Sequence, residues 1–299
     1  MTGDPVINRS DVAEATASEG DIRFARRRLA AAAGSRRIGA SLYAVPAGVR
    51  QMPVHVHGDE EEIFYVLSGA GLSWQRSGAC AVAPGDAIVH PPQGEPHTFL
   101  AGDAGLELLA FASGSDTNIT YLPRAKVMWC GPRWVPVDSP HPFRAEAAAG
   151  ALERPEPGER PANVVALAEL RPRSLPEPEE AQVRALGQAA GAVRAGLNHV
   201  KLRSGASGPP PHCHALEEEL FVVLEGTGTL RLGEDRHPLR AGDVIARPPG
   251  TGVPHSISAG DPGIVYLAYG TREPGDSVYY PQTGQVRLRG LGVTVDVSS

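Results

Sequence analysis

Short apolar runs separated by turn residues recur along the whole chain. In the first half the clearest runs are residues 63–67, 71–75, 87–90 and 106–111. They are rich in β-branched and aromatic residues, and Gly-Asp pairs at 85–86 and 242–243 mark turns. Short strands at regular spacing are typical of an all-β sandwich or barrel. The pattern therefore predicts an all-β fold.

Three alanine-rich segments interrupt this pattern. Residues 13–17, 26–33 and 179–189 contain enough alanine to favour a helix, but each segment is short. We therefore expect only a few short helices beside the strands.

The chain contains two copies of one unit. Eight positions of the first copy recur 157 residues later without an interruption. They are His55, His57, Glu62, Gly69, Gly85, Asp86, Pro91 and Pro92, matched by His212, His214, Glu219, Gly226, Gly242, Asp243, Pro248 and Pro249. Beyond the following loop the offset is 158, so that His97 matches His255 and Tyr121 matches Tyr279. An internal repeat of this length indicates two domains of similar fold.

A proline-rich stretch joins the two copies. Residues 132–161 hold seven prolines, a density that disfavours both helices and the inner strands of a sheet. A short apolar strand is expected near the start of each copy, at 6–7 and 164–165. We place the domain boundary near residue 147, so that the predicted domains are 1–146 and 147–299, with the linker at about 132–161.

Composition and charge narrow the choice of partners. The net charge of −6 leaves no cluster of Lys and Arg suited to a nucleic acid, and no run of 18 apolar residues suggests a membrane span. The start of the chain lacks the pattern of a secretory signal. Cys80, Cys130 and Cys213 are too widely spaced for a disulfide framework or a thiolate zinc site. We expect a cytoplasmic protein with a small-molecule substrate, for which a homo-oligomer is one option.

Three histidines and a glutamate of the first copy form a candidate metal site. Side chains two residues apart on a strand share a face, so His55 and His57 project together. Glu62 follows a predicted turn at 58–59, and His97 follows a Pro-Pro-x-Gly turn that brings the chain back. The four side chains are therefore expected to converge.

The second copy repeats these candidate ligands as His212, His214, Glu219 and His255. A lone His-x-His pair is more often a polar surface pair, but six histidines at matched positions favour metal binding. Imidazole and carboxylate groups suit a divalent first-row metal and leave positions open for a substrate or dioxygen. Each copy has three successive glutamates, at 60–62 and 217–219, so spacing alone leaves the ligating one open.

The chain resembles the cupin superfamily, whose first motif is Gly-x5-His-x-His-x(3,4)-Glu-x6-Gly. Six residues separate Glu62 from Gly69, and six separate Glu219 from Gly226. The resemblance therefore selects Glu62 and Glu219 as ligands. It implies two tandem double-stranded β-helix (jelly-roll) barrels, a bicupin, with one divalent transition metal per domain, Fe(II) being favoured over Mn, Cu, Ni or Zn.

The sequence departs from the family pattern in three places. The leading glycines, Gly48 and Gly205, stand seven residues before the first histidine, and the loop of the second copy is one residue longer. Ala101 and Ala259 replace the asparagine that closes the second motif. None of these changes removes a ligand.

The resemblance does not single out one reaction. Two-domain members of the family include oxalate decarboxylases and quercetin dioxygenases. The decarboxylases have an arginine three residues before the first ligand histidine, whereas Met52 and Pro209 stand there in this chain, which argues against oxalate. Our leading hypothesis is a dioxygenase-like oxidoreductase in which Fe(II) binds a small organic substrate, for example a carboxylate, beside O2. The alternatives are an isomerase, lyase or decarboxylase that uses no O2, and a non-catalytic binding protein.

Other residues near the motifs receive ordinary interpretations. Four glutamates beside the ligands are interpreted as solvated turn residues: Glu60, Glu61, Glu217 and Glu218. Cys213 is expected on the opposite face of its strand as a small buried side chain. Four histidines lack a matching histidine in the other copy and are assigned to surface or supporting positions: His90, His141, His199 and His237.

The copies also differ at positions that a barrel interior can contain. Trp74, Ala44, Leu42 and His90 of the first copy correspond to Arg231, Lys201, His199 and Arg247 of the second. These differences predict a more aromatic first pocket and a more cationic second pocket. A substrate carboxylate would prefer the cationic one.

Overall fold

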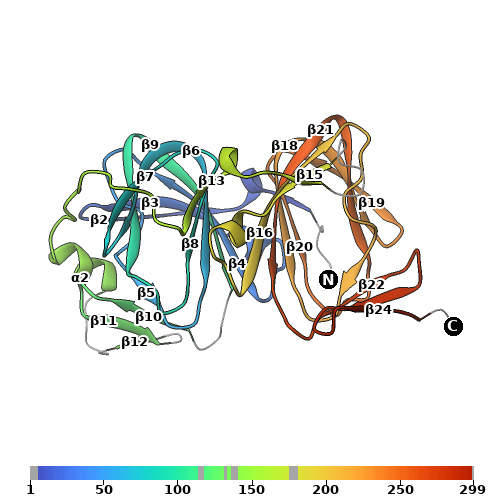
Figure 1. Cartoon of the computed structure of the whole chain (residues 1–299). Helices are drawn as coiled ribbons and strands as arrows, with labels where there is room; N and C mark the ends of the chain where they lie inside the picture. The colour runs from blue at the N-terminus through green and yellow to red at the C-terminus, as the bar shows by residue number, and fades with distance from the viewer. Residues whose placement is uncertain (1–5, 114–117, 131–132, 136–140, 175–180, 298–299) are drawn as a thin grey trace.

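The computed structural model describes residues 6–113, 118–130, 133–135, 141–174 and 181–297. Two barrels lie side by side, one coloured blue to green and the other yellow to red (Figure 1). Each is built from one eight-stranded and one four-stranded sheet. The all-β prediction and the predicted pair of barrels are confirmed.

The eight-stranded sheet of the first barrel has the order β13-β8-β6-β9-β4-β3-β2, with β7 paired to β6. Its strands are β2 (Glu14–Glu19), β3 (Ile22–Arg27), β4 (Ile38–Val45), β6 (Glu62–Gln75), β7 (Gly78–Val82), β8 (Asp86–His90), β9 (His97–Ser113) and β13 (Val164–Ala166). The four-stranded sheet comprises β5 (Val56–His57), β10 (Ile119–Leu122), β11 (Val127–Cys130) and β12 (Arg133–Val135).

The second barrel repeats this plan with the order β1-β20-β18-β21-β16-β15-β14, and β19 pairs with β18. Its strands are β1 (Ile7–Asn8), β14 (Arg173–Ser174), β15 (Ala181–Arg184), β16 (Ala195–Arg203), β18 (Glu219–Leu232), β19 (Asp235–Arg240), β20 (Asp243–Arg247) and β21 (His255–Thr271). The four-stranded sheet comprises β17 (Cys213–His214), β22 (Ser277–Tyr280), β23 (Gln285–Leu288) and β24 (Val293–Asp296).

A β-bulge bends the long central strand of each barrel. In β6 the register against β9 shifts between Gly69 and Gly71, and Gly69 has φ 80°. A Cβ at Gly69 would collide with the carbonyl oxygen of Gly105, and Gly226, with φ 78°, faces Gly263 in the same way. Only glycine adopts such a conformation at so close an approach without strain. The bulge therefore explains why a glycine, Gly69 or Gly226, stands seven positions after Glu62 and Glu219.

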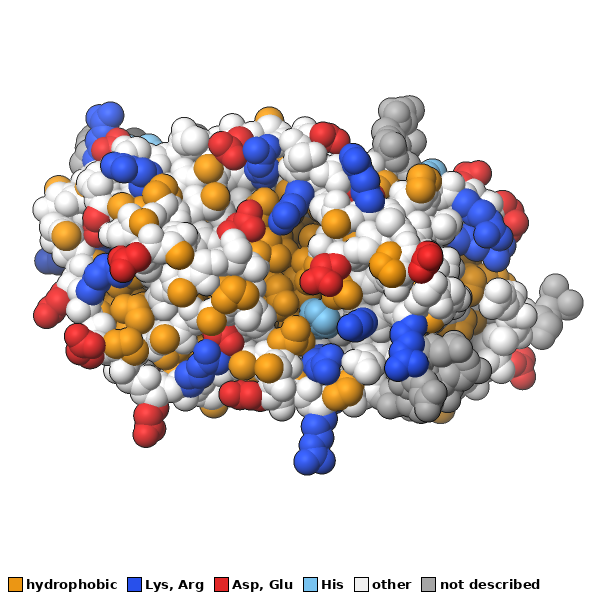
Figure 2. Space-filling view, turned by 90° about the horizontal axis from the view of Figure 1, so that it is seen from above, with side chains coloured by type: hydrophobic (Ala, Val, Ile, Leu, Met, Phe, Trp, Pro, Cys, Tyr) orange, Lys and Arg blue, Asp and Glu red, His pale blue; other side chains and the backbone are white. Residues whose placement is uncertain are grey.

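The apolar side chains of the described residues form three cores. One core lies inside each barrel, around Phe99 in the first and Tyr266 in the second. The third joins the barrels, and in it the rings of Phe111 and Tyr269 stack with centroids 5.2 Å apart. Apolar side chains also gather in the hollow between the two halves (Figure 2). Burial of apolar surface between the halves favours their association.

The two halves exchange their first strands. β1 pairs with β20, so that Ile7 lies opposite Val244 in the second sheet. β13 pairs with β8, so that Val164 lies opposite Ile88 in the first sheet. β1 thus belongs to the sheet of the second barrel, although it precedes every strand of the first along the chain. The short strands predicted near 6–7 and 164–165 are present, but each completes the sheet of the other copy. The division of the chain at residue 147 stays a prediction.

The prediction of a few short helices is confirmed, but one of the three predicted segments is a strand and the other two are helical only in part. Residues 14–19 form strand β2, and 26–33 contain the end of β3 and the one-turn helix α1 (Leu29–Ala32). Within 179–189, β15 precedes α3 (Leu186–Ala189), and residues 179–180 lie outside the described residues. Helices this short are unstable alone, so pairing with a neighbouring strand outweighs the helix propensity of alanine. In the predicted linker, His141 caps α2 (Pro142–Ala148), which begins at a proline.

Two buried glutamates fasten the barrels to each other. The side chain of Glu61 accepts hydrogen bonds from the backbone N–H groups of residues 193–195 at 3.0 to 3.1 Å. Glu218 accepts those of residues 36–38 at 2.6 to 3.1 Å. Both side chains are fully buried. The prediction that Glu61 and Glu218 are solvated was therefore wrong. The second barrel covers the turn that contains Glu61, and the first barrel covers the turn that contains Glu218.

We expect Glu218→Gln to lower the free energy of unfolding by about 2 to 3 kcal/mol. The glutamine side chain lacks the negative charge that strengthens the three hydrogen bonds from residues 36–38. Its NH2 group would also face backbone N–H groups, and two donors cannot form a hydrogen bond with each other. Urea denaturation measures the effect. Glu273→Gln is the matched control, because Glu273 faces the same loop only through an exposed pair with Arg37 at 3.9 Å, and its loss should cost less than about 1 kcal/mol. Equal effects of the two substitutions would contradict this role of Glu218.

Candidate metal centres

The four predicted residues of the first copy meet inside the first barrel. His57 ends β5, Glu62 begins β6 and His97 begins β9, while His55 forms a bridge to His97. The Oε2 atom of Glu62 lies 3.5, 3.2 and 2.9 Å from the Nε2 atoms of His55, His57 and His97. Strand ends from both sheets thus bring together side chains that lie far apart in the sequence.

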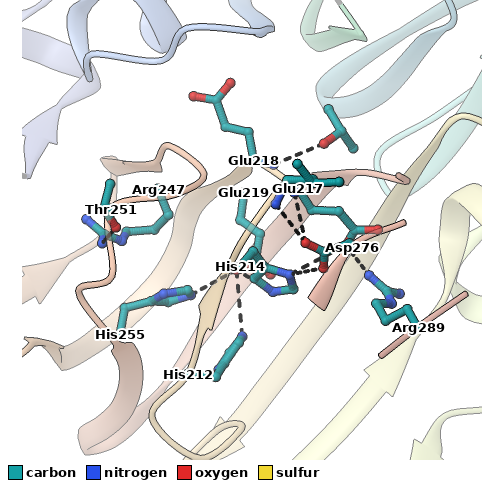
Figure 3. A network of polar contacts seen from close by, with 12 residues as sticks. His212, His214, Glu217, Glu218, Glu219, Arg247, Thr251, His255, Asp276 and Arg289 are labelled. Atoms are coloured by element: carbon teal, nitrogen blue, oxygen red, sulfur yellow. Dashed lines mark hydrogen bonds and ion pairs between the residues drawn. The ribbon is translucent and has the colours of Figure 1, made fainter. Parts of the chain in front are cut away.

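The second barrel repeats the cluster. The Oε2 atom of Glu219 lies 3.7, 3.4 and 2.9 Å from the Nε2 atoms of His212, His214 and His255. The three imidazoles turn toward Glu219 (Figure 3). All eight residues predicted from the sequence therefore fall into two clusters of four.

The second ring nitrogen of five of the six histidines has a partner of its own. Nδ1 of His55 lies 2.8 Å from the carbonyl oxygen of Pro53, and Nδ1 of His212 lies 2.8 Å from that of Pro210. Nδ1 of His97 lies 3.1 Å from the carbonyl oxygen of Glu95. A carbonyl oxygen only accepts, so Nδ1 carries the proton and the lone pair of Nε2 points into the cluster.

The donor set fits a divalent metal. Atoms bound to one ion at about 2.1 Å lie about 3.0 to 3.4 Å from each other, close to the separations within each cluster. In the second cluster Oε2 of Glu219 and Nε2 of His255 are buried and lie 2.9 Å apart, but neither has a hydrogen-bond partner of suitable geometry among the described residues. Buried polar atoms without a partner are costly unless an ion or water completes them. Each cluster can therefore hold a metal ion.

Electrostatic contacts within the clusters shift the pKa values of their members. Burial raises the pKa of Glu219, but the surrounding imidazoles outweigh burial and lower it to about 2. Burial likewise lowers the pKa of His57, but Glu62 outweighs burial and raises it to about 9. The carboxylates are thus charged at neutral pH, as metal ligands must be.

Residues beside the ligands differ between the copies. His90 stacks on His97 with ring centroids 3.6 Å apart, and burial, followed by His97, holds its pKa well below the usual range. Its counterpart Arg247 is buried and donates to the carbonyl oxygen of Val253 at 3.0 Å. The first site thus has a neutral ring where the second has a cation.

The two outer glutamates also contact ligands, and the prediction that they are solvated was wrong. Oε2 of Glu60 lies 3.3 Å from Nδ1 of His57. Oε2 of Glu217 lies 3.7 Å from Nδ1 of His214 and forms an ion pair with Arg289. Glu60 and Glu217 lie in the turns between a ligand histidine and a ligand glutamate. The alternation of side chains along a strand does not apply in a turn, so it could not predict these contacts.

A cavity of about 450 Å³ opens over the second cluster. Its lining includes His212, His214 and Glu219 together with four arginines: Arg173, Arg272, Arg287 and Arg289. The cationic residues that the sequence placed in the second pocket are not part of this lining: Arg231, Lys201, His199 and Arg247. Arg231, for example, forms an ion pair with Glu234 instead. The arginines come from segments outside the matched motif, where comparison of the copies gives no signal.

Sequence comparison identifies the repeat. Residues 41–111 and 198–268 each match the cupin domain, and each match contains all four clustered residues of its half. The chain is a bicupin. No curated protein matches the bicupin in sequence, and no described helix is long and apolar enough to span a membrane.

Solved structures with the same fold include two oxalate decarboxylases. The E162A mutant of the Bacillus subtilis enzyme is 17% identical, with a TM-score of 0.63, covering 95% of the bicupin and 81% of that chain. The formate complex of the Lactobacillus farciminis enzyme is also 17% identical, with a TM-score of 0.63, covering 91% of the bicupin and 87% of that chain. At this identity the likeness establishes the fold.

We expect metal binding at the first cluster to release a proton and to tighten as the pH rises from 7 to 9. His57, with a pKa of about 9 in the metal-free protein, must lose a proton before Nε2 can ligate. Co(II) titration of a His212→Ala/His255→Ala protein, which retains only the first cluster, should give up to about tenfold higher affinity per pH unit. An affinity that does not change over this range would contradict the expectation.

Proposed function

We propose that the bicupin is a metal-dependent enzyme that acts on a small carboxylate at the second cluster by a non-oxidative reaction of the decarboxylase or lyase type. The observation that carries the proposal is the cavity whose wall contains two histidines and the glutamate of the second cluster together with four arginines. A metal beside guanidinium groups matches a substrate with a carboxylate next to its reacting carbon.

His212, His214, Glu219 and His255 would hold the metal of the reactive site, and His55, His57, Glu62 and His97 would hold a second ion. A bound divalent ion supplies Lewis acidity, which polarises a substrate oxygen. The remaining tasks fall to side chains of the cavity wall.

Arg272 and Arg287 would bind the substrate carboxylate. Both line the cavity, and neither has a carboxylate partner among the described residues. Glu217 would carry the proton. It lies in the same wall, and burial raises its pKa although Arg289 opposes the shift. A carboxyl group with a raised pKa exchanges protons near neutral pH more readily than an ordinary one.

The decarboxylase type has better support than the dioxygenase predicted first. Decarboxylases are among the solved structures of the same fold, and the arginine-lined cavity suits a carboxylate. Oxalate itself is disfavoured, because Met52 and Pro209 replace the arginine expected from the resemblance. A cavity of about 450 Å³ also has room for a larger acid. An open cavity beside the cluster further argues against a purely non-catalytic protein.

The test is turnover of a panel of mono-, di- and oxo-carboxylates by protein loaded with Mn(II), Fe(II) or Co(II). We expect CO2 or another cleavage product at equal rates with and without O2. Arg287→Gln should raise KM at least about tenfold, because it removes a charge-assisted contact of about 1.5 to 3 kcal/mol. Arg236→Gln, on the outer strand β19, should leave KM unchanged.

Consumption of one O2 per substrate would contradict the non-oxidative reaction and restore the dioxygenase hypothesis. Absence of turnover with every acid and every metal would contradict the enzymatic proposal.

A further inference from the structure

The outer partner of one ligand histidine changes identity between the two copies. At the offset of 158 that relates the later halves of the repeats, Asn118 corresponds to Asp276. Each lies at the Nδ1 atom of the second histidine of its cluster, His57 or His214. Both residues lie outside the two motifs, so the motifs give no signal for this pair.

In the second barrel the carboxylate is fixed against the imidazole. Oδ2 of Asp276 lies 2.7 Å from Nδ1 of His214. Its Oδ1 accepts the N–H groups of Leu216 and Glu217 at 2.9 and 3.2 Å, and the residue is 1% exposed. Figure 3 shows Asp276 behind His214, on the side away from His212 and His255. Glu217, the other carboxylate nearby, is engaged with Arg289.

In the first barrel the same place holds a neutral amide. Nδ2 of Asn118 lies 2.8 Å from Nδ1 of His57 and 2.5 Å from Oε2 of Glu60. The hydroxyl of Thr120 lies 3.0 Å from Nδ1, whereas the Glu60 carboxylate stands farther off at 3.3 Å. The NH2 group of Asn118 donates and cannot accept the Nδ1 proton, so the nearest acceptor for His57 is the neutral hydroxyl of Thr120, a weaker acceptor than the Asp276 carboxylate at His214.

We propose that Asp276 is a positioning residue that makes the second cluster the tighter metal site, so that the two sites fill in a fixed order. A carboxylate that accepts the Nδ1 proton holds the ring in place and makes Nε2 a stronger donor to the metal. Loss of such a partner typically weakens metal affinity by 10 to 100-fold. The inference rests on the metal ligands assigned under the proposed function.

The test compares two single-site proteins titrated with Co(II), whose visible absorption reports its ligands. His55→Ala/His97→Ala leaves the second site, and His212→Ala/His255→Ala leaves the first. We expect the second site to bind Co(II) at least about tenfold more tightly. Asp276→Asn in the second-site protein should remove most of this advantage and shift the absorption bands. Two sites of equal affinity, or no effect of Asp276→Asn, would overturn the proposal.

The matched control is Asp243→Asn. Asp243 is also a buried carboxylate of the second barrel, and it accepts the backbone N–H of Arg240 at 2.8 Å, away from the imidazoles. Its substitution should lower the unfolding temperature without changing Co(II) affinity. If Asp243→Asn weakened Co(II) binding as much as Asp276→Asn does, the effect would reflect general destabilisation, and the role of Asp276 would be refuted.

A charge-neutral exchange tests the same idea as a gain. Glu60→Gln/Asn118→Asp moves the negative charge of the first site from residue 60 to the position that Asp276 occupies in the second. We expect Co(II) to bind the first site more tightly, and unchanged or weaker binding would count against the proposal. Failure of Co(II) to bind either single-site protein would instead refute the metal assignment itself, and this proposal with it.

Discussion

The structure depends on one constraint of the β-strand, which is that successive side chains point to opposite faces. At the start of β6, Glu62 turns inward to three imidazoles while its neighbour Glu61 turns outward to the backbone of the second barrel. Glu219 and Glu218 repeat this arrangement at β18. The same turn thus carries one glutamate of the cluster and one that binds the other barrel, so the segment that bears each cluster carboxylate is held between the two domains.

The fold and the six clustered histidines could be predicted from the sequence, because two His-x-His pairs and a later histidine recur at matched positions. The choice of Glu62 and Glu219 among three successive glutamates required the resemblance to the cupin motif as well. Contacts between the barrels leave no such signal. The exchange of β1 and β13, and the burial of Glu61 and Glu218, depend on how two complete barrels pack. Asp276 was missed because a partner behind an imidazole need only be near it in space.

The duplication provides two similar clusters in different surroundings. Beside the first stand a neutral histidine, His90, and an amide, Asn118; beside the second stand Arg247 and Asp276. A cavity lined by four arginines opens over the second cluster. This division suits a protein in which the second barrel carries the proposed reaction while the first supports it through the shared core and the two buried glutamates.

The most direct test of the central claim is anomalous diffraction from crystals soaked with Co(II), collected at the cobalt edge. We predict two peaks per chain, one in each barrel, each about 2.0 to 2.3 Å from three histidine nitrogens and one glutamate oxygen. The residues would be those clustered around Glu62 and Glu219. The absence of both peaks, or peaks only at other histidines such as His237, would contradict the account.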